Sequence, residues 1–578
     1  MRVRRDGRWM GLAYRQLADQ VQAASIGLRE LGLRDGDRVA ILSENRPEWA
    51  IADYACLAAR CTDVPIYPTL PGRQAEYILR DSGAAAVLVS SAAQLEKVLA
   101  LRDRLPALRH VVVFDACERP PGVLGFDQLL ECGRSALTRH PDWRAHALAA
   151  GPDDLATLIY TSGTTGDPKG VMLTHGNIAS NVTTCVAMFD FREGDECLSF
   201  LPLSHIFERM FGHYSMFHAG VIINYAGGID TVPSDMQELR PTMMASVPRL
   251  YEKIFARVLD NVRASSPFRR RIFAWARLVG EAWVDRSLSG APIPAGLALQ
   301  RRLADQLVFA KLRARTGGRI RFFISGGAPL AAEIAKFFYA AGMPILEGYG
   351  LTETSPVMAV NIFGQTKLGT VGRPIPGVEV RIAPDGEIVT RGPNVMHGYY
   401  GKPEATAEAI DADGWFHTGD IGVLDAEGYL RITDRKKDLI VTAGGKNIAP
   451  QPIENLAKSS KYVSNAVMLG DRRPFPIMLI VPQADPLKGW CARHGVPEDE
   501  LERMLSVAQV QAKLEREVRR TLRDLAQFEM PKKFLFLARD FSVEGGELTP
   551  TLKVRRRVVE ERHRAAIEGL YEEKTEGR

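Results

Sequence analysis

The sequence predicts an α/β protein in which a large N-terminal domain of helix-covered sheets, with a β-rich subdomain, precedes a small mobile α+β C-terminal domain. Three observations support this fold class. The chain has 578 residues, which is too long for one hydrophobic core and suggests roughly three or four modules. Short apolar runs alternate with segments of helical period over the first 240 residues. After Gly369, glycine and proline become frequent between short strand-like runs.

The alternating part predicts parallel sheets covered by helices. Residues 49–60 carry apolar side chains at helical spacing, and strand-like runs rich in β-branched residues lie on either side of them. The runs that we predict as strands are 39–42, 86–89, 110–114, 155–160 and 220–223. Because βα alternation places helices on both faces of a sheet, these runs are expected to be buried.

Changes of composition predict the domain boundaries. Residues 249–319 are rich in Arg, Ala and Leu, with few strand signals, and are interpreted as a helical insertion. Residues 369–434 contain the short runs 379–382, 387–390 and 429–433, which predict hairpins of a β-rich subdomain. The N-terminal domain is therefore expected over 1–436 and the C-terminal domain over 437–578.

Bulk composition favours an ordinary protein of the cytoplasm. The chain is 46% apolar and 25% charged, and its net charge of +5 gives no argument for nucleic acid. The seven cysteines show no C-x-x-C spacing, which is typical of reduced thiols. No signal peptide and no run of about 18 apolar residues is found. Two basic clusters, 269–271 and 555–557, are either solvated faces or points of peripheral contact with an anionic membrane.

The most informative segment runs from Thr161 to Gly170 and reads TSGTTGDPKG. It follows a predicted buried strand, so its glycines can bring backbone N–H groups close to a ligand. Its hydroxyls and its lysine suit the oxygens of a polyphosphate, although a flexible surface loop is the alternative, and the spacing is not that of a Walker A loop. The candidate phosphate-binding residues are Thr161, Ser162, Gly163, Thr164, Thr165, Gly166 and Lys169.

A second segment, EGYGLTE at residues 347–353, suits a nucleotide and a metal ion. Tyr349 lies between glycines, so a purine could stack on its ring. Thr352 offers a hydroxyl to phosphate, and Glu353 offers a carboxylate to Mg²⁺. The alternative makes Tyr349 a rim aromatic and Glu353 a surface acid.

Three further segments are weak signals taken singly. SGGAP at residues 325–329 follows a strand-like run and includes Gly327, but it could be only a turn. Asp420 follows a glycine and could accept both hydroxyls of a ribose. The run DRKKD at 434–438 is either a solvated turn or a hinge, and Lys553 alone cannot be told from other lysines.

Taken together, these segments resemble the AMP-forming acyl-CoA synthetases of the adenylate-forming superfamily, from about residue 10 to residue 570. The strings LPLSHIFER at 201–209 and VPRLYEK at 247–253, with the tail around Lys553, are similar to the long-chain fatty acid–CoA ligase branch. That branch also carries a helical insertion before its SGGAP segment.

The resemblance implies roles for single residues. It implies adenine contacts at Gly327 and Tyr349, ribose contacts at Asp420 and Arg435, and contact with the α-phosphate at Thr352. The remaining implied positions are Glu353 for Mg²⁺, His205 beside the acyl pocket, Lys437 as the hinge, Gly444 in the pantetheine tunnel and Lys553 as the catalytic lysine. A structural histidine is the alternative at His205.

The implied reaction joins a fatty acid to CoA in two steps. The carboxylate attacks the α-phosphate of ATP, pyrophosphate leaves, and CoA then displaces AMP, with ATP and CoA as co-substrates and Mg²⁺ as cofactor. The C-terminal domain is expected to turn about Lys437 between the steps. Two alternatives stay open: a fatty acyl-AMP ligase that loads a carrier protein, and a catalytically silent binder of acyl groups or nucleotides. The oligomeric state, monomer or homodimer, is not predicted.

Overall fold

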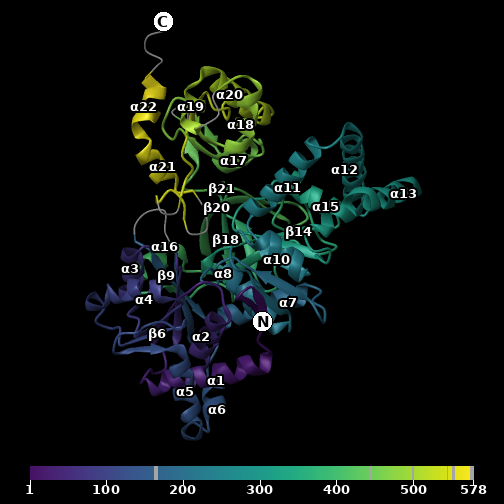
Figure 1. Ribbon diagram of the computed structural model, residues 1–578. Helices are drawn as coiled ribbons and strands as arrows, with labels where there is room; N and C mark the ends of the chain where they lie inside the picture. The colour runs from purple at the N-terminus through teal and green to yellow at the C-terminus, as the bar shows by residue number, and fades with distance from the viewer. Residues whose placement is uncertain (162–166, 443–445, 497–499, 543–544, 550–553, 573–578) are drawn as a thin grey trace. The chain divides into compact units, whose positions relative to one another are not determined.

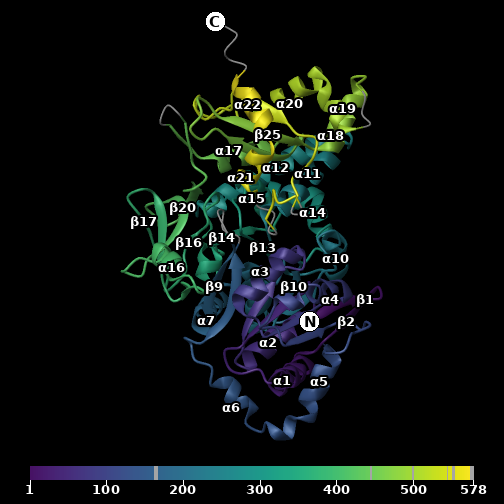
Figure 2. The same ribbon diagram turned by 90° about the vertical axis from the view of Figure 1, so that its left-hand side faces the viewer.

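The computed structural model describes residues 1–161, 167–442, 446–496, 500–542, 545–549 and 554–572. The chain divides into two compact units. Unit 1 comprises Met1–Arg381, Val389–Thr418 and Leu424–Leu430, and unit 2 comprises Ile382–Ile388, Gly419–Val423 and Arg431–Arg578. The division falls inside the predicted β-rich subdomain, so the boundary at residue 437 stays a prediction. Figures 1 and 2 show the ribbon in two views.

The first sheet of unit 1 has eight strands and contains most of the strand-like runs of the first 175 residues. Its central strands are parallel, and their side chains are buried on both faces, as expected for a helix-covered sheet. In sheet order the strands are β19 (Gly398–Tyr399), β9 (Lys169–Thr174), β8 (Leu155–Thr161), β4 (Thr62–Ile66), β3 (Arg38–Leu42), β5 (Ala86–Val89), β6 (His110–Val113) and β7 (Val123–Gly125).

Six helices of the first 150 residues accompany this sheet. Helix α1 packs on α2 and α5, and Figure 2 shows α1 beside α5. A close approach forces Gly133 on α5, because a Cβ there would lie 1.8 Å from the carbonyl oxygen of Ala23. The helices are α1 (Tyr14–Glu30), α2 (Pro47–Ala58), α3 (Gly72–Ser82), α4 (Ala92–Leu99), α5 (Phe126–Ser135) and α6 (Trp143–Leu148).

The second sheet has nine strands, of which β10 to β14 form its parallel centre. The run predicted at 220–223 begins two residues later, and the N-terminal hairpin of β1 and β2 was not predicted. In sheet order the strands are β16 (Arg373–Pro374), β15 (Val357–Val360), β14 (Ile345–Gly350), β13 (Phe322–Ser325), β12 (Met243–Ser246), β10 (Glu196–Ser199), β11 (Ile222–Tyr225), β1 (Arg2–Arg5) and β2 (Arg8–Gly11).

Residues 248–314 are helical and pack through a shared apolar cluster on one face of this sheet. The cluster includes Phe273 and Val279 of α12 and Phe337 and Phe338 of α15. The segments of 248–314 are α11 (Pro248–Arg263), α12 (Pro267–Leu288), α13 (Ala295–Ala304), the π-helix η4 (Asp305–Phe309) and α14 (Ala310–Ala314), and α15 (Ala332–Ala340) follows later in the chain.

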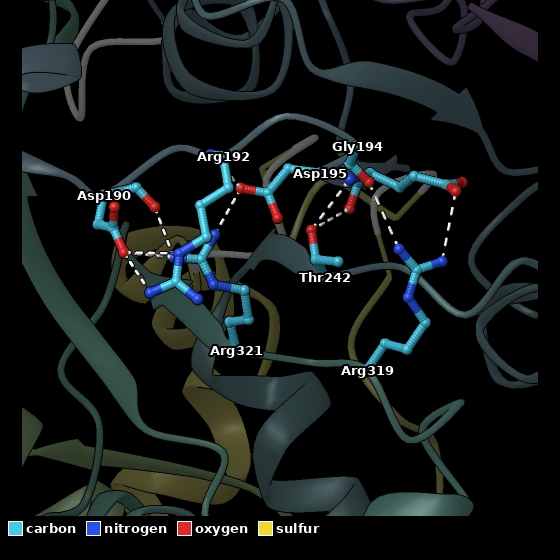
Figure 3. Close-up of polar contacts among 8 residues, drawn as sticks. Asp190, Arg192, Gly194, Asp195, Thr242, Arg319 and Arg321 are labelled. Atoms are coloured by element: carbon cyan, nitrogen blue, oxygen red, sulfur yellow. Dashed lines mark hydrogen bonds and ion pairs between the residues drawn. The ribbon is translucent and has the colours of Figure 1, made fainter.

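An ionic cluster joins the amino ends of the parallel strands in the second sheet. Arg321 pairs with Asp195 at 2.5 Å and with Asp190 at 3.0 Å, and Arg319 pairs with Glu196 at 3.4 Å (Figure 3). The backbone N–H of Glu196 donates to the Thr242 hydroxyl at 2.9 Å. These contacts fix one end of the sheet, while the SGGAP and EGYGLTE segments lie at the carboxyl ends of β13 and β14, where α/β sheets bind ligands.

The three predicted hairpin runs, together with the unpredicted strand β20, form a four-stranded sheet in the order β17–β18–β20–β21. These strands are β17 (Glu379–Ile382), β18 (Glu387–Arg391), β20 (Phe416–Leu424) and β21 (Leu430–Arg435). The other helical segments of unit 1 are α7 (His175–Met188), α8 (Ile206–Glu208), the π-helix η3 (Arg209–Ser215), α9 (Met216–His218), α10 (Val232–Leu239), η5 (Thr352–Thr354) and α16 (Pro403–Ala409), with the short 3₁₀ turns η1 (Arg102–Arg104) and η2 (Leu137–Arg139).

Unit 2 has a three-stranded sheet in the order β24–β25–β26 with its own apolar clusters on both faces. Its strands are β22 (Ile440–Val441), β23 (Asn447–Ile448), β24 (Val463–Leu469), β25 (Ile477–Pro482) and β26 (Lys533–Phe536). Its helices are α17 (Pro450–Lys458), α18 (Ala484–Arg493), α19 (Leu501–Ser506), α20 (Ala508–Thr521), α21 (Arg556–Arg562) and α22 (Arg564–Glu572). The predicted fold class is confirmed.

Candidate functional site

The two arms of the predicted phosphate loop are neighbouring antiparallel strands. Thr161 ends β8 and lies opposite Lys169, which begins β9. Gly170 lies opposite Tyr160, and a Cβ at Gly170 would come within 3.1 Å of the Tyr160 ring. The hairpin therefore holds Thr161 and Lys169 side by side at the mouth of the loop. The predicted residues Ser162, Gly163, Thr164, Thr165 and Gly166 lie outside the described residues.

A chain of contacts joins Lys169 to Glu353 through Tyr399. The Lys169 Nζ lies 4.8 Å from the centre of the Tyr399 ring, and the Tyr399 hydroxyl donates to Glu353 Oε1 at 2.9 Å. Strand β19 pairs with β9 and so places Tyr399 opposite Val171. Burial, and after it the charge of Glu353, raises the pKa of Tyr399, so its hydroxyl stays protonated and able to donate. Two residues predicted from separate motifs thus lie at one place.

The segment that carries Glu353 turns sharply after β14. A Cβ at Gly350 would lie 1.7 Å from the carbonyl oxygen of Pro356, so glycine is required there. Thr352 and Glu353 then form the 3₁₀ turn η5, and the backbone N–H of Met396 donates to the Glu353 carbonyl at 2.8 Å. Tyr349 is only 8% exposed, and its stacking on a purine stays a prediction.

The SGGAP segment faces the helix that follows His205. A Cβ at Gly326 would touch the Phe207 ring at 3.1 Å, and Gly327 has a φ of +83°. The His205 Nδ1 accepts from the Phe207 backbone N–H at 3.2 Å and so caps α8. The neutral imidazole therefore carries its proton on Nε2, which makes Nε2 a donor.

Asn45 holds the loop that leads to His205, and sequence reasoning missed this residue. Its Nδ2 donates to the Leu201 carbonyl at 2.7 Å and to the Ser199 hydroxyl at 3.3 Å, while its Oδ1 accepts from the Leu203 N–H at 2.9 Å. The Asn45 side-chain amide therefore both donates to and accepts from the backbone of this loop, as a neighbouring peptide group would.

A buried ionic cluster lies behind the same helix. Arg209, the first residue of η3, pairs with Asp53 of α2 and Asp63 of β4, and all three side chains are fully buried. Its Nη1 donates to the Thr157 hydroxyl at 2.8 Å, and the Tyr214 hydroxyl donates to Asp53 at 3.2 Å. The cluster ties the segment after His205 to the first sheet, and no sequence motif indicated it.

The predicted ribose residues both belong to unit 2 and form an ion pair. Arg435 Nε lies 3.3 Å from Asp420 Oδ1, and Asp420 is buried on β20. The neighbouring Lys436 pairs with Asp385 at 2.6 Å and Glu387 at 2.9 Å. Hydrogen bonds to these two carboxylates raise the pKa of Lys436. Lys437 follows as an exposed residue, whereas Gly444 and Lys553 lie outside the described residues.

An apolar cavity of about 260 Å³ lies among α2, α7 and α9 in unit 1. Three of its lining residues, Tyr214, Phe217 and His218, belong to the helical stretch that begins after His205. The others are Tyr54, Leu57, Ala156, His175, Ile178, Ala179, Val182 and Thr183. Such a lining favours hydrocarbon over polar ligands.

Comparison with known proteins identifies the family. The model of the AMP-binding enzyme matches residues 2–400, and the model of the AMP-binding enzyme C-terminal domain matches residues 437–575. The chain belongs to the AMP-binding enzyme family. The match to the acyl-CoA synthetases that the motifs predicted is confirmed.

Curated relatives extend over nearly the whole chain. The long-chain-fatty-acid–CoA ligase FadD15 of Mycobacterium tuberculosis is 38% identical over 98% of this chain and 93% of its own. The peroxisomal long chain acyl-CoA synthetase 6 of Arabidopsis thaliana is 35% identical over 99% of this chain and 83% of its own.

Solved structures show the same fold. The anthranilate CoA ligase AuaEII in complex with anthranoyl-AMP matches with a TM-score of 0.73 at 20% identity, over 98% of this chain and 94% of that one. ATP-bound MatB from Rhodopseudomonas palustris matches with a TM-score of 0.69 at 25% identity, over 96% and 94%.

Proposed function

We propose that this protein is a long-chain fatty acid–CoA ligase, which forms acyl-AMP from ATP and then acyl-CoA. Relatives with that name cover almost the whole chain. The structural observation that carries the proposal is the contact chain Lys169–Tyr399–Glu353 at the mouth of the Thr161–Gly170 loop. Each CH₂ of an acyl chain that becomes buried contributes about 0.8 kcal/mol, so an apolar acyl pocket would favour long chains.

In the first step two anions must meet, so positive charge is the main requirement. Lys169 and the hydroxyls of its loop bind the departing pyrophosphate, and Thr352 contacts the α-phosphate. Lys553 bridges the carboxylate and the α-phosphate, a role that rests on the likeness of its tail segment to the family. His205 presents its Nε2–H beside the acyl carboxylate.

The residues around Glu353 fit a magnesium ion. Carboxylate oxygens are protein ligands that Mg²⁺ prefers, and the 3₁₀ turn η5 places the Glu353 carboxylate next to Thr352, the residue proposed to contact the α-phosphate. Among the described residues there is no group of three or more His, Cys, Asp or Glu that could hold a metal ion. One carboxylate is enough where phosphates complete the shell. When bound, Mg²⁺ neutralises phosphate charge.

The nucleoside contacts of this proposal rest on the likeness of four positions to the family. Gly327 and Tyr349 line the adenine, and Asp420 with Arg435 holds the ribose hydroxyls. One carboxylate oxygen of Asp420 pairs with Arg435, and this ion pair orients the Asp420 carboxylate toward the two hydroxyls of the ribose. In the second step, Gly444 leaves room for the pantetheine arm of CoA, and Lys437 is the hinge.

The test supplies purified protein with preformed palmitoyl-adenylate and follows the fate of the acyl group. A CoA ligase converts the adenylate to palmitoyl-CoA and AMP when CoA is added. An enzyme that loads a carrier protein leaves the adenylate unchanged with CoA, and a silent binder leaves it unchanged with every acceptor. Either of these results contradicts the proposal. Within the described ranges, none of the helices combines the length and the hydropathy needed to span a bilayer. A cytoplasmic location and peripheral membrane contact stay predictions.

A further inference from the structure

Helix α3 of unit 1 makes a hydrogen bond to each arm of the loop at residues 161–170. The Tyr77 hydroxyl donates to the Pro168 carbonyl at 3.1 Å, directly before β9 begins. The Tyr160 hydroxyl, near the end of β8, donates to Asp81 Oδ2 at 2.7 Å. Tyr77 and Asp81 are four residues apart, so both side chains project from the same side of α3. One face of this helix therefore holds the chain where it enters the loop and where it leaves the loop.

Helix α3 is itself fixed to the first sheet. Its buried side chains include Ile78 and Leu79, which share an apolar cluster with residues of β3 and β5. At the carboxyl end of the helix, Arg38 Nε of β3 donates to the Ser82 carbonyl at 2.8 Å. This bond satisfies one of the carbonyls that a helix end leaves without a partner inside the helix. The face of α3 that contacts the loop is therefore held in place by the sheet.

The Tyr160 ring links the two arms of the loop to each other. Gly170 lies opposite Tyr160 in the hairpin, and a Cβ at Gly170 would come within 3.1 Å of this ring. The rings of Tyr77 and Tyr160 meet edge to face with their centroids 6.4 Å apart. Burial, and after it the hydrogen bond to Asp81, raises the pKa of Tyr160, so its hydroxyl keeps its proton and can donate.

The bond from Tyr77 also bears on the residue that follows Pro168. The peptide unit is planar, so a bond that fixes the Pro168 carbonyl also fixes the direction of the Lys169 N–H and the start of β9. Lys169 is thus placed by α3 on one side and by its strand pairing with Thr161 on the other. Groups that are held in place before a ligand arrives lose less freedom when the ligand binds, which strengthens binding.

We propose that Tyr77 and Asp81 are positioning residues for the polyphosphate of ATP. We refer to these two residues as the α3 brace. They hold the arms of the loop so that Lys169 and the loop hydroxyls meet the β- and γ-phosphates, and neither residue touches the ligand. The inference rests on the proposed function and assigns it two residues that no motif indicated. The α3 brace acts on ATP and not on AMP, because AMP lacks the phosphates that the loop contacts.

The test measures the dissociation constants of the full chain for ATP and for AMP by calorimetry, with Mg²⁺ and without fatty acid or CoA. Tyr77→Phe removes one hydroxyl. Loss of one neutral hydrogen bond should raise Kd for ATP about fivefold and leave Kd for AMP unchanged. Asp81→Ala removes the acceptor of the Tyr160 hydroxyl and should also raise Kd for ATP about fivefold. Asp81→Asn keeps an oxygen acceptor and should recover most of the affinity that Asp81→Ala loses.

The matched control is Tyr571→Phe in unit 2. The Tyr571 hydroxyl donates to the Phe475 carbonyl at 3.1 Å, which is the same kind of bond at the same length as the bond from Tyr77. The control should leave both dissociation constants unchanged. An equal rise of Kd for ATP and AMP in Tyr77→Phe overturns the α3 brace, because a general loss of structure would affect both nucleotides. An unchanged Kd for ATP overturns it as well.

A second measurement separates the α3 brace from the proposed function. With ATP below saturation, Tyr77→Phe should slow pyrophosphate release about fivefold, yet convert supplied palmitoyl-adenylate and CoA at the unaltered rate, since pyrophosphate has left before CoA reacts. Slowing of both steps overturns the α3 brace. If the unaltered protein binds ATP but activates no fatty acid, the proposed function fails, while the difference between ATP and AMP still decides on the α3 brace. Absence of ATP binding by the unaltered chain overturns both.

Discussion

Glu353 is the residue on which the proposed chemistry depends most directly. Glu353→Gln keeps the size and the acceptor of the Tyr399 hydrogen bond but removes the negative charge. Loss of a charge-assisted contact in a site for phosphate is expected to lower pyrophosphate release by about 100-fold. Binding of ATP in the absence of Mg²⁺ should change little. Glu379→Gln is the control, because this exposed residue forms an ordinary surface ion pair with Arg391. Equal activity of the two variants would remove Glu353 from the mechanism.

A buried acid beside the candidate acyl region predicts a pH dependence of stability. Burial raises the pKa of Glu208 from 4.5 to about 8. The Glu208 carboxyl packs directly against Gly212, where a Cβ would lie only 2.2 Å from its Oε1. The folded state holds the Glu208 proton up to a higher pH than the unfolded state does. The contribution of this group to stability is therefore fully present below about pH 4.5 and is lost as pH rises through about 8. Across that window this one group lowers the free energy of unfolding by at most about 1.4 kcal/mol per pH unit.

Glu208→Gln stays uncharged and should flatten that dependence. The measurement is denaturant unfolding of both proteins between about pH 5 and about pH 8, taking the difference between them at each pH. The variant should gain stability relative to the unaltered protein toward the alkaline end. A constant difference would show that the Glu208 carboxyl does not titrate in this window.

At the residue scale, sequence reasoning found the groups that belong to contiguous motifs. Glu353 and Lys169 were predicted from their strings, and the structure brings them together through Tyr399. Tyr399 could have been suspected from the Gly-Tyr-Tyr-Gly string at 398–401. Asn45 could not, because its partners are more than 150 residues away and only the meeting of two sheets makes the contact.

At the element scale, the segment from β10 to α9 depends on contacts with the first sheet. Asn45 clamps its loop and the Arg209 cluster clamps its helix, so His205 lies between two fixed points. Asn45→Asp keeps the oxygen that accepts from the Leu203 N–H. It replaces the NH₂ group that donates to the Leu201 carbonyl with a carboxylate oxygen, which repels that carbonyl. We expect KM for the fatty acid to rise about tenfold, which corresponds to about 1.4 kcal/mol, while KM for ATP is nearly unchanged.

The matched control for that variant is Asn361→Asp. Asn361 makes the same kind of clamp, donating to the Thr370 carbonyl at 2.7 Å and accepting from the Lys367 N–H at 3.0 Å. It should lose similar stability without the change in KM for the fatty acid. NMR of the His205 imidazole provides a readout that is independent of turnover. If both variants shift KM alike, Asn45 is merely structural.

Sequence pattern located several buried parallel strands whose apolar runs are short and bounded by turn residues, but it missed β4, β10 and β12. Strands β3 and β5 match the predicted runs 39–42 and 86–89 to within one residue. The N-terminal hairpin was missed because β1 and β2 are rich in arginine and lack an apolar alternation. The π-helix η3 was missed too, since its buried Arg209 and His213 look polar in sequence and are paired only by tertiary contacts.

At the scale of the whole molecule, the central prediction is that two steps use two arrangements of the C-terminal domain. Lys553→Ala should lose acyl-AMP formation by about 100-fold or more yet still convert supplied acyl-adenylate to acyl-CoA. Lys437→Pro restricts the backbone at the proposed hinge and should mainly slow thioester formation. Each step is measured separately, by pyrophosphate release and by acyl-CoA formation. Equal loss of both steps in both variants would contradict a hinge at residue 437.

The proposal as a whole is tested most directly by pyrophosphate release from ATP and Mg²⁺ with acetate, octanoate, palmitate, oleate and an aromatic acid, with and without CoA. A long-chain fatty acid–CoA ligase releases pyrophosphate over many turnovers only when CoA is present, and fastest with palmitate or oleate. Release that stops after one equivalent despite CoA would contradict the assignment of CoA as the acceptor, and no release with any of the acids would contradict the proposed activity.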